Sequence, residues 1–63
     1  MNVVILYIID RQSGKLLYQD IGNPTHVFKD IADNEDFTLE QPPINEPQKR
    51  YWYNNQWNDK PSN

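Results

Sequence analysis

The chain has 63 residues, with nine acidic and six basic side chains, a formal net charge of −3 and no cysteine. This length lies near the lower limit for a domain that folds alone. The lack of cysteine excludes disulfides, thiolate metal sites and a cysteine nucleophile. The acidic balance argues against a nucleic-acid-binding protein, which needs a basic surface. Only 37% of the residues are hydrophobic, so we expect association with another polypeptide to add buried surface.

The longest apolar stretch is Val3 to Ile9 (VVILYII), and it is rich in β-branched side chains. These residues favour a strand, and the stretch is too short to span a membrane. Side chains alternate along a strand, so Val4, Leu6 and Ile8 share one face and the four odd-numbered residues share the other. Because both faces are apolar, we expect a second copy or another protein to cover the face of Val4, Leu6 and Ile8.

The start of the chain has no basic region and no small-residue cleavage site, and Asp10 directly follows the apolar stretch. This pattern is not that of a signal peptide. We therefore expect a protein of the host cytoplasm or of a virion, with no membrane partner.

A hairpin is predicted around Asp10 to Lys15 (DRQSGK). Aspartate accepts hydrogen bonds from nearby backbone N–H groups, and Gly14 can adopt the left-handed conformation that such a loop needs. The returning strand is then Lys15 to Ile21, in which Leu16 and Tyr18 are predicted to share one face.

The residues from Thr25 to Ala32 fit two structures. Pro24 can begin a short helix that Asn23 caps, with Val27, Phe28 and Ile31 on one face. In a strand, Val27, Lys29 and Ile31 would alternate instead. A helix of this length is marginal without packing, so we favour a strand or irregular chain.

Acidic residues form a polar turn over residues 33–36, and a short strand is predicted over 37–40 with Phe37 and Leu39 inward. The spacing of the carboxylates does not fit a calcium loop, since an alanine takes a ligand position and the required glycine is missing. His26 has too few neighbouring ligands for a metal site. We expect no metal, no cofactor and no catalytic residue.

Three prolines between Gln41 and Gln48 indicate a stiff, extended connector. An aromatic hairpin follows, in which Asn54 and Asn55 form a two-residue turn. This turn places Trp52 opposite Trp57. The aromatic side chains are candidates both for core packing and for contact with a partner or a saccharide; they are Tyr51, Trp52, Tyr53 and Trp57. If the tryptophans face inward, the tyrosines become the better contact candidates.

Three segments follow one another in an order that resembles short modules of bacteriophage tail-fibre, tail-accessory and fibre-assembly proteins. They are YIIDRQSG (Tyr7 to Gly14), DFTLEQPP (Asp36 to Pro43) and YWYNNQW (Tyr51 to Trp57). The glycine usual in the last turn of those modules is replaced here by Asn55, and residues 21–34 have no counterpart. The resemblance implies a non-enzymatic structural or assembly protein of a phage, often oligomeric.

The sequence therefore predicts a mainly β fold, a small antiparallel meander of two hairpins and a short middle strand, with a short helix near residues 24–32 as the alternative there. One domain over residues 1–57 and a flexible tail over 58–63 are expected. The favoured function is a phage tail-associated protein that binds itself or another tail protein. A carbohydrate-binding module and a phage-encoded inhibitor of a host defence enzyme are the alternatives.

Overall fold

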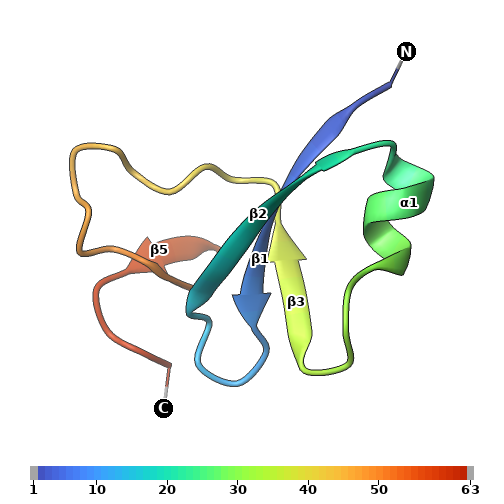
Figure 1. Ribbon diagram of the computed structural model, residues 1–63. Coiled ribbons are helices and arrows are strands. Elements are labelled where there is room, and N and C mark those ends of the chain that lie inside the picture. Colours follow the sequence, from blue (N-terminus) through green and yellow to red (C-terminus); the bar gives the residue numbers. More distant parts are fainter. Residues whose placement is uncertain (1, 63) are drawn as a thin grey trace.

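The computed structural model describes residues 2–62. Its elements are β1 (Val4–Asp10), β2 (Leu16–Gly22), α1 (Pro24–Lys29), β3 (Glu35–Thr38), β4 (Tyr51–Tyr53) and β5 (Gln56–Asn58). β1 is the central strand of an antiparallel sheet of order β2-β1-β3, and β4 and β5 form a separate hairpin (Figure 1). The predicted mainly β class is confirmed, and both predicted hairpins are present.

Both apolar faces of β1 are covered by other parts of the same chain over residues 6–9, whereas Ile5 stays 42% exposed. On the helix side, Leu6 and Ile8 pack against Val27 of α1 and are 0% and 1% exposed. On the opposite, aromatic side, Tyr7 and Ile9 pack against Trp57. α1 thus occupies the position that the sequence analysis assigned to a second chain, and Leu6 and Ile8 do not reach the surface.

Residues 24–29 form a helix, so the interpretation that favoured a strand here is wrong. The side chain of Asn23 accepts a hydrogen bond from the Thr25 backbone N–H at 2.9 Å, and Pro24 occupies the first turn, where its missing N–H costs nothing. Val27 is buried against the sheet, and the Phe28 ring meets the Phe37 ring edge-on at 5.0 Å. These contacts stabilise a helix that is too short to persist alone.

A β-bulge at Leu17 changes the predicted faces of β2. Ile8 lies opposite Tyr18, whereas the next residue of β1, Ile9, lies opposite Leu16, so Leu17 is the extra residue. Leu16 therefore faces the aromatic side with Ile9, while Tyr18 faces the helix side with Ile8. The prediction that Leu16 and Tyr18 share a face is wrong for this reason.

β3 lies two residues earlier than expected. Phe37 lies opposite Ile8, and its neighbour Thr38 lies opposite Tyr7 and is buried on the aromatic side. The strand ends at Thr38, and the chain bends directly afterwards. Leu39 is consequently 63% exposed, so the prediction that it faces inward is wrong.

Candidate contact surfaces

The aromatic hairpin has the register predicted from its sequence. Asn54 and Asn55 both have positive φ, 55° and 60°, as a tight hairpin turn of this type requires. Trp52 and Trp57 lie opposite each other with their rings edge to face, 5.3 Å between centroids. Trp57 is only 9% exposed, and its indole Nε1–H donates to the carbonyl oxygen of Glu40 at 3.1 Å. Trp57 is therefore a core residue of the chain.

Backbone hydrogen bonds join the hairpin to the first loop. The N–H of Trp52 donates to the carbonyl oxygen of Gly14 at 2.8 Å, and the N–H of Leu16 donates to that of Arg50 at 2.8 Å. Gly14 has a φ of +82°, and a Cβ at this position would collide with the carbonyl oxygen of Trp52. Glycine is needed here both for its backbone conformation and for the close approach of β4.

Asp10 and Ser13 hold the same loop in shape. The Asp10 carboxylate accepts hydrogen bonds from the backbone N–H and the hydroxyl of Ser13, both at 2.9 Å. These bonds, that of the backbone N–H first, hold the pKa of Asp10 below its ordinary value, since they favour the ionised form. The C-terminal segment also returns to this loop, where the N–H of Ser62 donates to the carbonyl oxygen of Ser13 at 3.1 Å.

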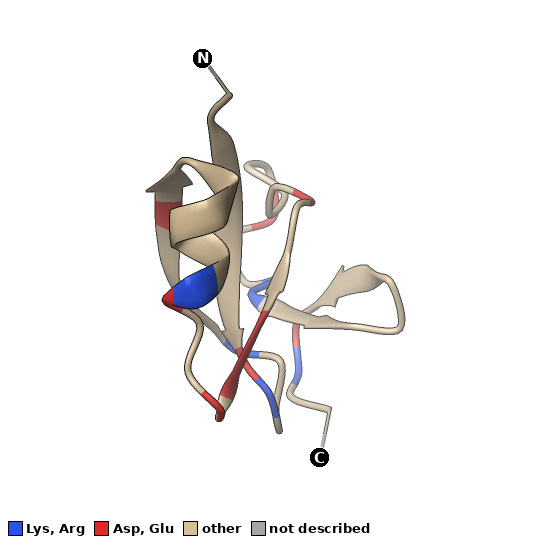
Figure 2. Ribbon diagram, turned by 90° about the vertical axis from the view of Figure 1, so that its right-hand side faces the viewer, with Lys and Arg blue, Asp and Glu red and all other residues tan. Residues whose placement is uncertain are grey.

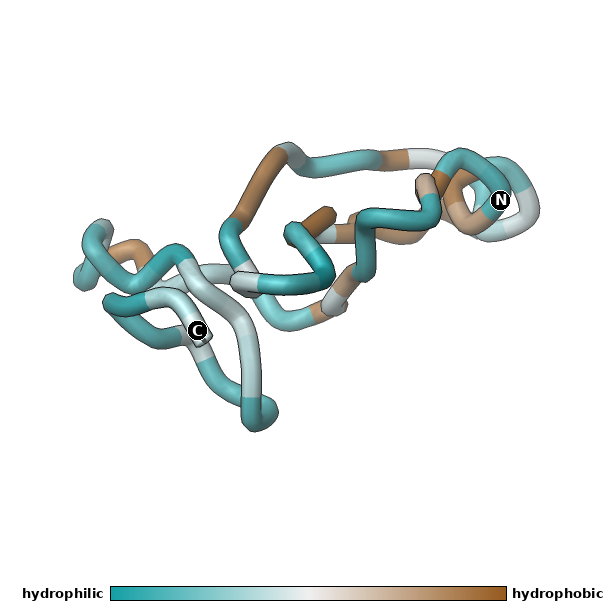
Figure 3. The backbone as a smooth tube through the Cα atoms, turned by 90° about the horizontal axis from the view of Figure 1, so that it is seen from below, coloured by the Kyte–Doolittle hydropathy of each residue, from teal (hydrophilic) through white to brown (hydrophobic). Residues whose placement is uncertain are grey.

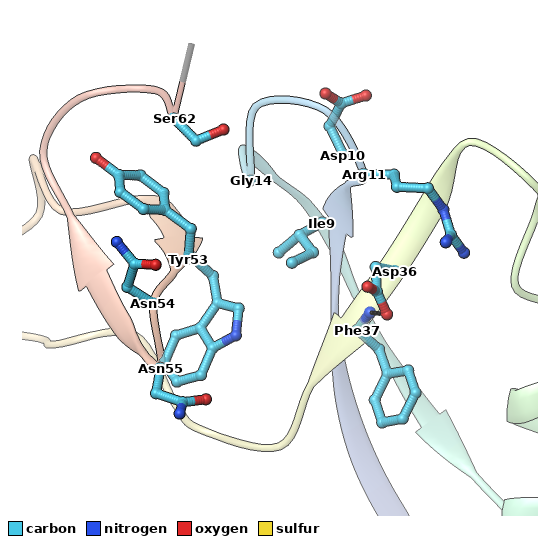
Figure 4. A pocket seen from close by; sticks show the side chains of 11 residues that line it. Ile9, Asp10, Arg11, Gly14, Asp36, Phe37, Tyr53, Asn54, Asn55 and Ser62 are labelled. Atoms are coloured by element: carbon cyan, nitrogen blue, oxygen red, sulfur yellow. Dashed lines mark hydrogen bonds between the residues drawn. The ribbon is translucent and has the colours of Figure 1, made fainter.

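An open groove of about 340 Å³ lies between this loop, β3 and the aromatic hairpin (Figure 4). Aromatic, amide and charged side chains line it together; they include Arg11, Asp36, Trp52, Tyr53, Asn54 and Asn55. In a sugar-binding site, aromatic rings stack on the face of the sugar, and amide and carboxylate groups form hydrogen bonds with its hydroxyls. We name these six residues the aromatic groove.

The structure separates the aromatic candidates that the sequence grouped together. Trp57 is buried, and Trp52 packs against its cluster while also lining the aromatic groove. Tyr53 is half-buried and lines the groove as well, whereas Tyr51 is half-buried outside it. The predicted face of Val4, Leu6 and Ile8 lies under α1, with only Val4 half-buried at its edge.

A second surface, which the sequence analysis did not identify, lies beside the outer part of β2. A groove of about 390 Å³ lies between β2 and the proline-rich connector, and Tyr7, Leu17, Pro42 and Ile44 line it beside the polar side chains of Gln19, Gln41 and Arg50. Ile5 and Ile21 lie opposite each other on the same face of the sheet as Tyr7, and they are 42% and 56% exposed. We name these six apolar and aromatic residues the apolar strip; Ile44 is its most exposed member, at 77%.

Arg50 organises the connector that carries Ile44. Its guanidinium donates to the backbone carbonyl oxygens of Pro43, Glu46 and Lys49 at 3.4, 3.5 and 3.0 Å. A lone isoleucine among prolines and polar residues is the sequence signal that could have identified this surface. Figure 3 shows the contrast along the chain, with hydrophobic backbone segments concentrated in the region of β1, β2 and α1 and a mostly hydrophilic region around the C-terminus.

The acidic turn has a structural role. One Glu35 carboxylate oxygen accepts the Ala32 N–H at 3.0 Å and the Tyr18 hydroxyl at 3.1 Å. Desolvation, followed by this bond, raises the pKa of Tyr18.

Among residues 2–62, no three His, Asp or Glu side chains are grouped so that they could hold a metal ion.

Within the part of the chain that the structure describes, no helix has the length and apolar composition needed to cross a membrane. No family model, no curated protein and no solved structure matches the chain.

Proposed function

We propose that this chain is a non-enzymatic protein of a bacteriophage tail, a structural or assembly component that acts through protein–protein contact at the apolar strip. The observation that carries the proposal is the composition of this surface. About a quarter of the chain is charged, yet Arg50 is the only charged residue among those that line the groove beside β2. Exposed apolar surface of this kind, bordered by polar residues, is typical of a protein interaction site.

The three segments that carry the resemblance to tail modules pack against one another. The first and third segments meet where Trp52 bonds to Gly14, and the second and third meet where Trp57 bonds to Glu40. The residues behind the resemblance therefore hold one compact unit together.

Site-specific photo-cross-linking tests the proposal. We would place a benzophenone amino acid at position 44 in the apolar strip and, as a matched control, at position 28 on the opposite, helix side, where Phe28 is 43% exposed. In phage-infected cells we expect a cross-link to a tail protein from position 44 and none from position 28. A cross-link to a host enzyme, or equal yields from both positions, would contradict the proposal.

A saccharide-binding function is the second candidate, and the aromatic groove favours it. Trp52 and Tyr53 stand beside Asn54, Asn55 and Asp36 at one opening (Figure 4). A bound sugar would change the fluorescence of the half-buried Trp52, and the Tyr53→Ala variant would weaken the response. An unchanged spectrum across a panel of cell-wall saccharides eliminates this candidate.

A further inference from the structure

One edge of β1 is only half covered. β3 pairs with Tyr7 to Asp10 of β1, and no strand within residues 2–62 pairs with Val4 to Leu6 on that side. Figure 2 shows β3 as the strand that begins in red. Beyond the arrowhead of β3, the chain diverges from β1. Among the described residues, the N-terminal half of β1 therefore has a neighbouring strand on one side only.

The residue that would extend β3 along this edge is engaged elsewhere. Continuing the observed register would place Glu40 opposite Ile5. The Glu40 N–H instead donates to the Thr38 hydroxyl at 3.2 Å, and its carbonyl oxygen accepts the Trp57 indole N–H. The chain thus bends away at this point and leaves the edge of β1 open beside Ile5.

The backbone groups of Ile5 point to the open edge. The Asp10 N–H donates toward β2, to Lys15, and the Arg11 N–H donates to the other side, to Asn34. Neighbouring residues of a strand direct these groups to opposite sides, and the irregularity in this pairing lies in β2. Even-numbered residues of β1 therefore face β2, whereas Ile5, and Val3 before it, face the open edge.

We propose that this edge binds the same edge of a second copy of the chain, antiparallel and with Val4 opposite Val4. The proposal rests on the contact function proposed above and adds a second copy of the chain as a partner at a further surface, the open edge of β1. The occupant must be a strand, because the open edge offers backbone N–H and C=O groups. An uncharged, apolar strand suits it best, because residues 3–9 are apolar or aromatic and offer no opposite charge to a charged partner. The chain itself supplies such a segment, Asn2 to Leu6, which includes the first three residues of β1.

The geometry favours this register over the two that are shifted toward Tyr7. With Val4 opposite Val4, Ile5 of each copy lies opposite Val3 of the other, so that both pairs can exchange two hydrogen bonds. A two-fold axis at Ile5 would place Val3 opposite Tyr7, whose outward groups already pair with Thr38. A shift by one residue would place Ile5 opposite Val4, whose backbone groups face away toward β2.

The other edge of the sheet is less suited to pairing. β2 carries the bulge at Leu17 and a charged residue, Asp20, and the backbone N–H of its first residue, Leu16, already donates to the carbonyl oxygen of Arg50. Bulges and charges are features that protect edge strands from pairing. The N-terminal half of β1 has neither feature, and in Figure 2 it is uncoloured by charge.

A matched pair of N-methylated proteins tests the proposal. We would synthesise the full chain with an N-methyl group on Ile5 or on Ile21, two isoleucines that lie opposite each other and direct their N–H groups to opposite edges. Sedimentation equilibrium should show a dimer of the native chain. We expect N-methyl-Ile5 to weaken it at least about tenfold and N-methyl-Ile21 to leave it unchanged. Equal melting temperatures would show that both proteins fold.

Two results would overturn the edge pairing: a native chain that stays monomeric at millimolar concentration, or a dimer that tolerates N-methyl-Ile5. In mixed isotope-labelled samples, an intermolecular contact between the Val4 Hα atoms of two copies would support it. These outcomes do not depend on the cross-link at position 44. A cross-link to a tail protein without a dimer would leave the contact function in place and remove only the second copy as its partner.

Discussion

The backbone N–H of Trp52 donates to the carbonyl oxygen of Gly14 at 2.8 Å, and this bond joins the aromatic hairpin to the loop between β1 and β2. Through it, residues far apart in the sequence form one aromatic layer over Tyr7 and Ile9. The chain therefore covers the Tyr7 and Ile9 part of the second face of its central strand by itself.

The Gly14→Ala substitution should lower the free energy of unfolding by roughly 1–3 kcal/mol. The new Cβ would meet the Trp52 carbonyl oxygen, and the positive φ of this residue disfavours any side chain. Gly22→Ala is the control, since Gly22 has no positive φ and its added Cβ would meet only a Val27 methyl group at 3.2 Å. Urea unfolding followed by tryptophan fluorescence measures both. An equal or larger loss in Gly22→Ala would contradict this role of Gly14.

The Trp57→Phe substitution should cost about 1 kcal/mol more stability than Trp52→Phe. Both changes shorten an aromatic side chain, but only the first removes the indole N–H that donates to Glu40 and holds the chain at the end of β3. Thermal unfolding measured by circular dichroism compares the two. Similar melting temperatures for both variants would show that the bond to Glu40 adds little.

The Asn23→Ala substitution should lower the stability by about 1 kcal/mol, because it removes the N-cap of α1. Asn23→Asp keeps an oxygen that can accept the Thr25 N–H and should retain most of the stability. Since α1 covers Leu6 and Ile8, the alanine variant should also bind more of a dye that detects exposed apolar surface. Equal losses in both variants would show that the cap does not stabilise α1.

Stability should fall in acid through Asp10. Its native pKa lies below the value in the unfolded chain, so the unfolded state binds more protons as the pH falls. The stabilisation is complete above the unfolded pKa of about 3.9 and is lost as the pH drops through the native pKa. Urea unfolding between pH 2 and 7 measures the free energy of unfolding at each pH. In the Asp10→Asn variant this free energy should fall less steeply toward low pH than in the native chain. A variant that keeps the native pH dependence would contradict this contribution.

The parts of the fold that depend on local patterns could be predicted from the sequence. The short apolar run Val3 to Ile9, rich in β-branched residues, indicates a strand, and two asparagines between aromatic residues specify a tight turn. The register of the aromatic hairpin follows from these neighbours alone and is confirmed, with Trp52 opposite Trp57.

The parts that depend on distant contacts could not be predicted. The helix at residues 24–29 forms because Val27 packs on β1, a contact that its own sequence does not reveal. The bulge at Leu17 reverses the face of Leu16, and no local composition marks it. The same applies to the apolar strip, where Ile44 approaches β2 only because the connector folds around Arg50.

Amide hydrogen exchange at single-residue resolution, on the chain diluted below any self-association, tests most directly the claim that β1 is covered from within the chain and open along half of one edge. We predict slow exchange for Leu6 and Ile8, whose N–H groups face β2. We predict fast exchange for Ile5, whose N–H faces the open edge. Exchange of Leu6 and Ile8 as fast as that of Ile5 would contradict the claim, because the strand would then need a second chain to stay folded.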